Sequence, residues 1–221
     1  MENALIIGAS GGIGSALGAA LAARGVAVTG LSRTADGLDI TDAASVERHL
    51  GGLSAPFDLI FVATGALQIG DARPEKTLKR LDPEAMVAQF RLNCVGPSLV
   101  LAQALRLLPR DRRAVFAALS ARVGSIGDNR LGGWYSYRAA KAALNQMLRG
   151  GAIELARSHP AAICVALHPG TVETPLTRRY AAGRSTVTPA AAARNLLDVI
   201  DGLTTDDMGQ FFDWQGKRVP W

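Results

Sequence analysis

Short apolar runs alternate with longer segments of helical periodicity along most of the chain. The apolar runs predict buried strands at residues 4–7, 26–31, 58–63, 114–119, 161–167 and 210–213. Apolar residues that recur at helical spacing predict helices at residues 13–24, 42–50, 82–108, 134–159 and 189–203. Pro83 suits the first turn of its helix, whereas Pro97 predicts a bend or break.

This alternation predicts the fold class. Strands that alternate with helices form parallel βαβ units with right-handed crossovers. We therefore expect an α/β fold, a single doubly wound Rossmann domain over residues 1–221, with a mostly parallel sheet of about seven strands. In such sheets ligands bind beyond the carboxyl ends of the strands, and each motif described below follows a predicted strand or lies at such an end.

Composition and charge narrow the classes of partner. The formal net charge is +5, which can indicate nucleic acid or an anionic ligand. The arginines are scattered among acidic residues rather than gathered on one helix, so we expect no nucleic-acid partner. We also expect no membrane segment and no signal peptide, because no apolar run approaches the length of a bilayer.

Cysteine and histidine usage adds two further expectations. Cys94 and Cys164 each lie in an apolar segment, which favours reduced thiols in a cytoplasmic protein. The three histidines share no metal-ligand spacing, so we expect no metal site.

The first predicted strand leads into a glycine-rich turn that opens a helix, Gly8-Ala9-Ser10-Gly11-Gly12-Ile13-Gly14. The free N–H groups and the dipole at a helix start favour a pyrophosphate, and residues without a Cβ allow its close approach. No Lys-Ser or Lys-Thr follows, which disfavours a nucleoside-triphosphate P-loop. The turn predicts a dinucleotide site, with a tight turn that binds nothing as the alternative.

The end of the second predicted strand bears on the choice of dinucleotide. An NAD site usually places an acidic residue there, whereas the 2′-phosphate of NADP needs donors and positive charge. Here the sequence has Ser32, Arg33 and Thr34. We therefore expect NADP(H) rather than NAD(H), unless Arg33 is only a surface loop residue.

A tyrosine and a lysine follow each other at helical spacing in the segment 134–159. Tyr137 and Lys141 are four residues apart and so share a helix face. A nearby cation favours a phenolate and lowers its pKa, which makes the pair a candidate general acid/base for a carbonyl or alcohol oxygen.

Taken together, these residues resemble the short-chain dehydrogenase/reductase family over essentially the whole chain. Residues 122–126 and 211–221 are similar to its C-factor-like or sniffer-like branch, and Ala63-Thr64-Gly65 matches the family's Asn-Asn-Ala-Gly segment loosely. The resemblance implies a cofactor site formed by Gly8, Ser10, Gly11, Gly12, Ile13, Gly14, Ser32, Arg33, Asp39, Ile40, Ala63, Thr64, Gly65, Tyr137, Lys141, Pro169, Gly170, Val172 and Thr174.

The resemblance also implies roles for the catalytic residues. Tyr137 exchanges a proton with the substrate oxygen, and Lys141 holds the nicotinamide ribose and lowers the tyrosine pKa. Asn93 positions a relay water. The implied substrate is a small carbonyl or alcohol compound of unspecified identity, and the implied assembly is a homodimer or homotetramer through the helices at 82–108 and 134–158.

One family position departs from the pattern. The family's oxyanion-stabilising serine aligns with Ala121, and Ser120 precedes it on the predicted strand. Strand side chains alternate between faces, so a one-residue offset turns Ser120 away from the substrate unless the loop is bulged. We take Ser120 as the serine, with Ser125 as the next candidate. The departure leaves a second interpretation open, a catalytically weak NADP(H)-binding sensor.

Residues 173–188 mix Thr, Arg, Gly and Ala between the Pro-Gly turn and the last predicted helix. We expect this segment to cover the substrate as a lid.

Overall fold

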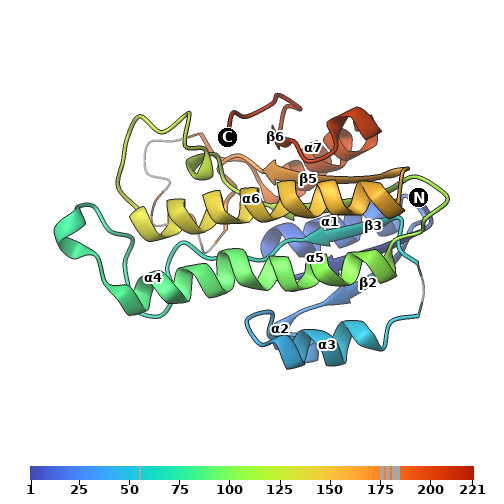
Figure 1. The fold of residues 1–221 in the computed structure, drawn as a ribbon, viewed down its shortest axis with the longest axis horizontal. Coiled ribbons are helices and arrows are strands. Elements are labelled where there is room, and N and C mark those ends of the chain that lie inside the picture. Colours follow the sequence, from blue (N-terminus) through green and yellow to red (C-terminus); the bar gives the residue numbers. More distant parts are fainter. Residues whose placement is uncertain (55, 175–176, 178–179, 181–184) are drawn as a thin grey trace.

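The structure is a computed structural model that describes residues 1–54, 56–174, 177, 180 and 185–221. A twisted parallel sheet forms its centre, in the order β2-β1-β3-β4-β5-β6 (Figure 1). Its strands are β1 Asn3–Ile7, β2 Ala27–Leu31, β3 Leu59–Val62, β4 Ala114–Leu119, β5 Ala162–His168 and β6 Phe211–Asp213. Each of the six predicted strands is thus confirmed within two residues at either end.

The sheet of the described residues has six strands rather than about seven. The connection that follows β2 is the reason. It holds only the four-residue helix α2 (Arg33–Asp36) before helix α3 begins at Ala43. A parallel crossover needs roughly a dozen residues or more, so this connection has no room for a helix and a further strand. The strand β2 therefore forms the edge of the sheet.

Helices cover both faces of the sheet. Helices α1 and α7 pack together on one face, and α3, α5 and α6 pack in a row on the other (Figure 1). The bounds of the main helices are α1 Gly12–Ala23, α3 Ala43–Gly51, α4 Pro83–Phe90, α5 Gly96–Leu107, α6 Tyr135–Ser158 and α7 Pro189–Gly202.

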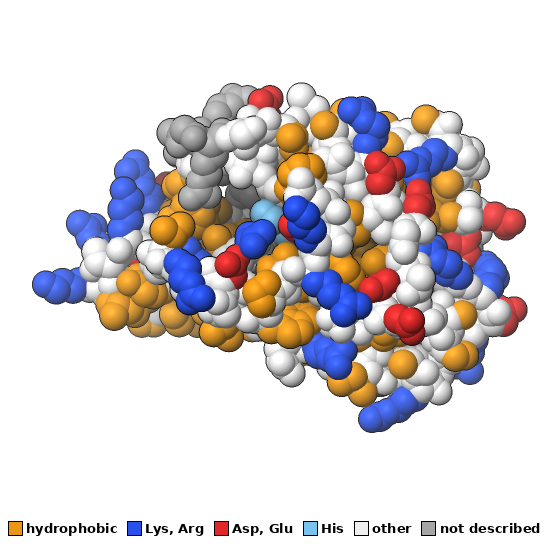
Figure 2. All heavy atoms as spheres, turned by 90° about the horizontal axis from the view of Figure 1, so that it is seen from above, with side chains coloured by type: hydrophobic (Ala, Val, Ile, Leu, Met, Phe, Trp, Pro, Cys, Tyr) orange, Lys and Arg blue, Asp and Glu red, His pale blue; other side chains and the backbone are white. Residues whose placement is uncertain are grey.

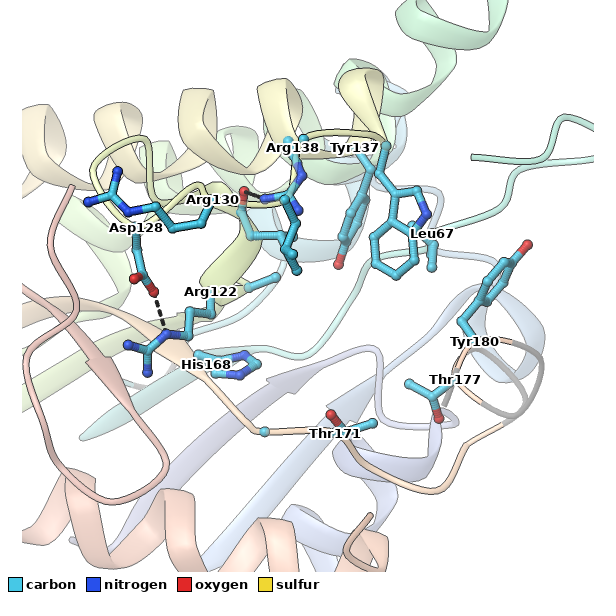
Figure 3. A pocket seen from close by; sticks show the side chains of 16 residues that line it. Leu67, Arg122, Asp128, Arg130, Tyr137, Arg138, His168, Thr171, Thr177 and Tyr180 are labelled. Atoms are coloured by element: carbon cyan, nitrogen blue, oxygen red, sulfur yellow. Dashed lines mark hydrogen bonds and ion pairs between the residues drawn. The ribbon is translucent and has the colours of Figure 1, made fainter. Parts of the chain in front are cut away.

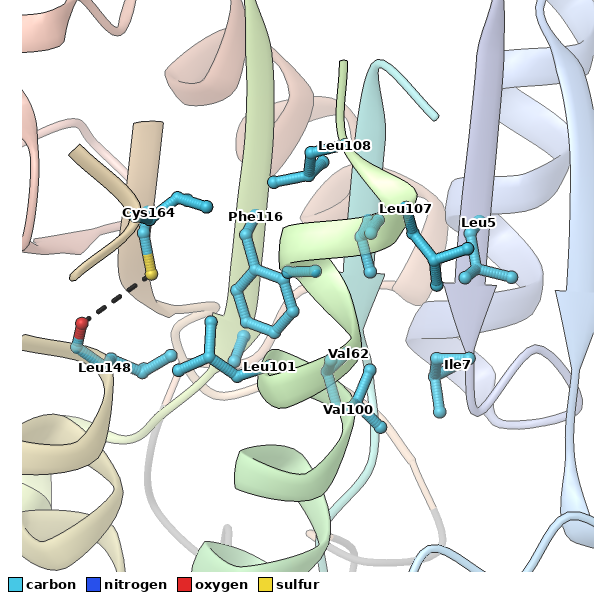
Figure 4. Packing of buried hydrophobic residues seen from close by; sticks show 14 of the residues in the cluster. Leu5, Ile7, Val62, Val100, Leu101, Leu107, Leu108, Phe116, Leu148 and Cys164 are labelled. Carbon is cyan, nitrogen blue, oxygen red and sulfur yellow. Dashed lines mark hydrogen bonds between the residues drawn. The ribbon is translucent and has the colours of Figure 1, made fainter. Parts of the chain in front are cut away.

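Strand β4 shows how the sheet divides the core. Ala114, Phe116 and Ala118 face the α5–α6 side, whereas the residues between them face α1 and α7. Phe116 is fully buried and packs among Leu101 and Leu148 (Figure 4). Burial of a side chain of this size contributes roughly 1.5–3 kcal/mol. Because both faces are covered, the open carboxyl edge of the strands is where a ligand can approach.

The helix predicted at 82–108 is continuous but contains a π-helical turn between two α-helical segments. Helix α4 runs into a π-helical turn, Arg91–Val95, and α5 follows with Pro97 in its first turn. Proline has no N–H to donate, which favours such a turn just before it. By length and hydropathy Pro83–Leu107 could cross a membrane, although we expected no membrane segment. However, α5 packs Val100, Leu101 and Ala104 into the core.

The C-terminal residues close the sheet edge beside the loop after β4. Asp213, the last residue of β6, accepts backbone hydrogen bonds from Gln215 and Lys217. Trp221 stacks on Phe211 with ring centroids 6.0 Å apart, and its carbonyl accepts the N–H of Gly127 at 2.8 Å. The C-terminus therefore fixes part of the loop that leads to α6.

Candidate active site

The glycine turn is closely packed. Gly8 has φ +89°, and a Cβ there would lie 2.9 Å from the Cγ2 of Thr64. A Cβ on Gly14 would lie 2.2 Å from the carbonyl oxygen of Gly8, so only glycine fits there. Gly11 precedes α1 without a side-chain cap, which leaves the first N–H groups of the helix without intrahelical partners. The start of α1 therefore offers donors at the carboxyl edge of the sheet.

Two more loops meet the glycine turn at this edge. A Cβ on Gly12 would lie 3.2 Å from the methyl group of Thr174, which follows β5. Gly65 has φ +147° and lies beside Asn93 and Lys141. A Cβ on Gly65 would be 2.9 Å from Oδ1 of Asn93 and 3.2 Å from Nζ of Lys141. The residues after β1, β3 and β5 thus lie around one region.

Tyr137 and Lys141 occupy the first turns of α6, as their spacing predicted. The ammonium of Lys141 is 6.0 Å from the ring centroid of Tyr137 and donates to the carbonyl of Leu119 at 2.8 Å. Lys141 is buried, and this burial lowers its pKa to about 8. Burial raises the pKa of Tyr137 to about 12 in the free protein, in the direction opposite to our expectation. The cause is desolvation of the phenol.

Asn93 lies in the π-helical turn and is completely buried. Its amide donates to the carbonyl of Ala66 at 2.9 Å and to Gln89 at 2.7 Å, and its Oδ1 accepts the N–H of Ala66 at 3.1 Å. These hydrogen bonds hold the loop after β3 against the helix. Asn93 and Lys141 both lie next to Gly65, but the Asn93 side chain is occupied by protein partners.

A cavity of about 640 Å³ opens in front of Tyr137 (Figure 3). Trp134 and Tyr180 meet edge to face at its rim, with ring centroids 5.9 Å apart. The lining residues come from the loops after β3, β4 and β5 and from the start of α6, and they are Leu67, Ala121, Arg122, Val123, Asp128, Arg130, Leu131, Gly132, Trp134, Tyr137, Arg138, His168, Gly170, Thr171, Thr177 and Tyr180.

A buried carboxylate fixes the start of α6. Trp134 has a left-handed backbone, φ +51°, which is unusual for a bulky residue. Its N–H donates to the carbonyl of Glu75 at 2.5 Å. The Glu75 carboxylate also accepts the N–H of Ser136 at 3.3 Å and the Ser136 hydroxyl. Glu75 thus caps the helix and holds Trp134 at the cavity rim.

Residues 37–185 match the family model described as short chain dehydrogenase. The chain belongs to the short-chain dehydrogenase family. The 1-hydroxy-2-glutathionyl-2-methyl-3-butene dehydrogenase of Rhodococcus sp. strain AD45 is 31% identical over 100% of both chains. The C-signal of Myxococcus xanthus is 37% identical over 64% of this chain and 81% of its own, in agreement with the C-factor-like branch.

A solved structure extends the likeness to the whole fold. A short-chain dehydrogenase/reductase from Burkholderia multivorans, with bound NADP, superposes with a TM-score of 0.81. It is 25% identical, and the match covers 100% of this chain and 99% of that one. The predicted family and α/β class are therefore confirmed.

Neither Ser120 nor Ser125, the two candidate oxyanion serines of this dehydrogenase, lines the cavity. The Ser120 hydroxyl is buried and donates to Oδ1 of Asn145 at 2.6 Å, because Ser120 continues the face of β4 that packs on α6. The Ser125 hydroxyl accepts the N–H of Asp128 at 3.1 Å. Ala121 lines the cavity instead. Ser120, which we assigned to the oxyanion, is thus turned away from the cavity, as the alternation of strand side chains requires.

The residues after β2 are arranged differently from the expectation in one respect. Arg33 is exposed, but Ser32 is buried and donates its N–H to Asp36 at 2.7 Å and its hydroxyl to the same oxygen at 3.2 Å. An acidic residue, Asp36, thus lies near the end of this strand after all, and its carboxylate accepts hydrogen bonds from Ser32. Thr34 donates to Ser10 of the glycine turn at 2.9 Å.

Asp39 and Ile40 both have partners within the protein. The Asp39 carboxylate accepts two hydrogen bonds from Thr41, which lower its pKa. Ile40 is buried against Gly96, where a Cβ would lie 2.7 Å from its Cδ1. Their contact with an adenine remains a prediction.

The Pro169-Gly170 turn and the predicted lid meet the cavity. Gly170 has φ +79°, and a Cβ there would lie 3.0 Å from the Cδ1 of Trp214. Val172 is buried and forms a bridge with Val187, which joins the two ends of the segment 173–188. Tyr180, which lines the cavity, donates to Gln68 at 3.0 Å. The remaining lid residues 175–176, 178–179 and 181–184 lie outside the described residues.

Sequence reasoning missed the charged wall of the cavity and its support. Arg122, Arg130 and Arg138 line it, and His168 lies with them with its Nδ1 buried and no partner among the described residues. Burial lowers the pKa of His168 to about 4, so it is neutral at neutral pH. The position of Arg138 directly after Tyr137 is the one signal that could have found this wall. Within the described ranges, no His, Cys, Asp and Glu residues are grouped as a metal site would require.

Proposed function

We propose that this dehydrogenase is an NADP(H)-dependent oxidoreductase that transfers a hydride between nicotinamide and a carbonyl or alcohol substrate. The observation that carries the proposal is the position of Tyr137, which lines a cavity at the carboxyl edge of the sheet beside Lys141. The NADP held by the Burkholderia multivorans relative supports the choice of cofactor. We place the protein in the cytoplasm, because Cys94 and Cys164 are free thiols.

The turn residues fit a dinucleotide. The packing at Gly8 and Gly14 leaves no room for a Cβ, and the uncapped start of α1 offers N–H groups to a pyrophosphate. Arg33 is exposed next to the glycine turn and would bind a 2′-phosphate. The cofactor, when bound, supplies or accepts the hydride.

Tyr137 exchanges the proton at the substrate oxygen. With a pKa raised to about 12, its hydroxyl is protonated at neutral pH and is ready to donate to a carbonyl oxygen as that carbon is reduced. Lys141 holds the ribose and offers positive charge to the phenolate that forms. Asn93 acts on the water relay as a positioning residue, because its side chain holds the loop beside Lys141.

Replacement of Tyr137 by Phe tests the proposal. We expect NADPH oxidation with a panel of aldehydes, ketones and quinones to fall by about 10²–10⁴-fold, the range for loss of a general acid. NADPH affinity, followed by fluorescence titration, should change little. Tight NADPH binding by the native protein with no turnover of any panel member would instead favour the sensor. The retained Tyr137 and Lys141 argue against the sensor, since sensing needs no acid/base group.

Arg33→Ala tests the choice of cofactor separately. We expect the affinity for NADPH to fall by about ten-fold or more, as for loss of a charge-assisted hydrogen bond, while the affinity for NADH changes little. Equal affinity for NADPH before and after the substitution would remove the argument from Arg33.

We also propose that the protein is a homodimer or homotetramer. Large apolar side chains are exposed on the α4, α5 and α6 side, namely Val87, Leu105, Met147 and Ile153. An apolar face of this kind is typical of an interface. Light scattering would give the mass, and a monomer at micromolar concentration would contradict the proposal.

A further inference from the structure

The cavity in front of Tyr137 is unusually rich in positive charge. Arg122, Arg130 and Arg138 line it, whereas Asp128 is the one carboxylate among its described lining residues. Figure 2 shows basic side chains around a hollow that contains a histidine side chain. His168 adds no charge at neutral pH, because its pKa is lowered to about 4 by burial. The lining therefore carries an excess of two positive charges.

The three arginines are not equivalent. Arg122 forms ion pairs with Asp128 at 2.5 Å and with Asp213 at 3.7 Å, so acidic neighbours balance its charge. Arg138 donates to the carbonyls of Gly133 at 2.9 Å and Val123 at 3.3 Å, which orient the guanidinium. Among the described residues, none forms a hydrogen bond or ion pair with the guanidinium of Arg130.

The cavity also has a direction. In Figure 3, Tyr180 and Tyr137 lie toward one end, and Arg122, Asp128 and Arg130 lie toward the other, with Arg138 between them. The aromatic end is apolar, since Leu67 and Trp134 line it as well. A ligand that fills the whole cavity must therefore present an apolar body near Tyr137 and an anionic group near Arg130.

We propose that the substrate is a carbonyl compound that carries a carboxylate, and that Arg130 binds this carboxylate. The inference rests on the proposed function, since it places the reacting carbonyl at Tyr137. A guanidinium is suited to a carboxylate because its planar fork donates two parallel hydrogen bonds. The Arg122–Asp128 pair forms the wall behind this subsite and leaves Arg130 to the ligand.

Two aldehydes of nearly equal shape test the subsite. 4-Carboxybenzaldehyde carries the anion, and methyl 4-formylbenzoate is its neutral ester. We expect kcat/KM of the native protein with NADPH to favour the carboxylate by about ten-fold or more, the usual effect of a charge-assisted hydrogen bond. The preference should weaken as salt is added, because salt screens partly exposed charges.

Arg130→Gln should bring the ratio of the two kcat/KM values to within about two-fold of one, because it removes the charged guanidinium and keeps the side chain polar. Arg157→Gln is the matched control, because Arg157 is exposed in the last turn of α6 and does not line the cavity. The control should keep the native preference. An equal kcat/KM for both aldehydes in the native protein, or an unchanged preference in Arg130→Gln, would overturn the inference.

A binding measurement separates the subsite from catalysis. Calorimetry with NADP⁺ present compares 4-methylbenzoate with its methyl ester, neither of which can be reduced at an aldehyde. We expect the carboxylate to bind more tightly to the native protein, and the difference to disappear in Arg130→Gln. If neither aldehyde is reduced but this difference is found, the proposed function fails and the subsite stands. If the aldehydes are reduced but the two ligands bind equally, only the subsite fails.

Discussion

Lys141 carries an ionisable group in an almost completely buried position, which makes its protonation part of the stability of the fold. Its side chain is 2% exposed, and its ammonium has the Leu119 carbonyl as hydrogen-bond partner. Burial lowers its pKa from an ordinary 10.5 to about 8. Between these two values the unfolded chain holds a proton on this group that the folded protein has released. Stability therefore rises with pH across this window.

The size of the effect follows from the shift. A shift from 10.5 to about 8 corresponds to roughly 3 kcal/mol across the full window, at 1.36 kcal/mol per pH unit. Between about pH 7 and about pH 9, where only the lower part of the window is crossed, the gain is about 1 kcal/mol. Tyr137 and Cys164, whose pKa values are raised to about 12, act in the opposite direction at higher pH.

Lys141→Met removes the titrating group, so it isolates this contribution from the others. Urea denaturation at about pH 7 and about pH 9 should show that the native protein gains about 1 kcal/mol more than the variant does. Lys217→Met, at an exposed position, is the control and should behave as the native protein does. The same pH response in native protein and Lys141→Met would show that Lys141 keeps an ordinary pKa, and the reasoning from burial would be wrong.

Three other substitutions test the site. Ser120→Ala should leave kcat within about two-fold but lower the free energy of unfolding by about 1–3 kcal/mol, because Asn145 loses a buried hydrogen bond; a large loss of kcat at full stability would restore Ser120 as the oxyanion donor. Ala121→Ser places a hydroxyl on the cavity wall, and we expect a rise in kcat of up to about ten-fold in carbonyl reduction, with no change as the contrary result. Gly14→Ala sets a methyl group 2.2 Å from the Gly8 carbonyl oxygen. NADPH affinity should fall, and the free energy of unfolding should fall by about 1–3 kcal/mol. A variant that binds NADPH normally would contradict the packing.

The strands could be predicted because each is a short apolar run between turn residues. Strand β4 is the clearest case, since all its residues from Ala114 to Leu119 are buried. The number of strands could not be predicted as well, because it depends on whether the connection after β2 has room for another strand. Periodicity likewise could not show that Arg91–Val95 is a π-helical turn, since α-helical and π-helical turns share one sequence pattern over so few residues.

The cofactor turn and the Tyr137–Lys141 pair were accessible from sequence because each depends on local spacing within one element. The serine was not, since Ser120 and Ala121 differ by one position and so face opposite ways. The arginine wall was missed for another reason. Arg122 begins a 3₁₀ turn and Arg130 lies in the loop that follows, and their charges become a cavity lining only because this segment packs against α6.

The start of α6 supplies several side chains of the cavity wall. Trp134, Tyr137, Arg138 and Lys141 all lie in or just before the first two turns of this helix, and all but Lys141 line the cavity. One buried residue, Glu75, holds that helix end through Trp134 and Ser136. Because a rigid helix moves as a unit, any shift at Glu75 would displace Tyr137 and Arg138 together. Two side chains of the cavity wall, Tyr137 and Arg138, are therefore positioned by the same contact rather than by two independent loops.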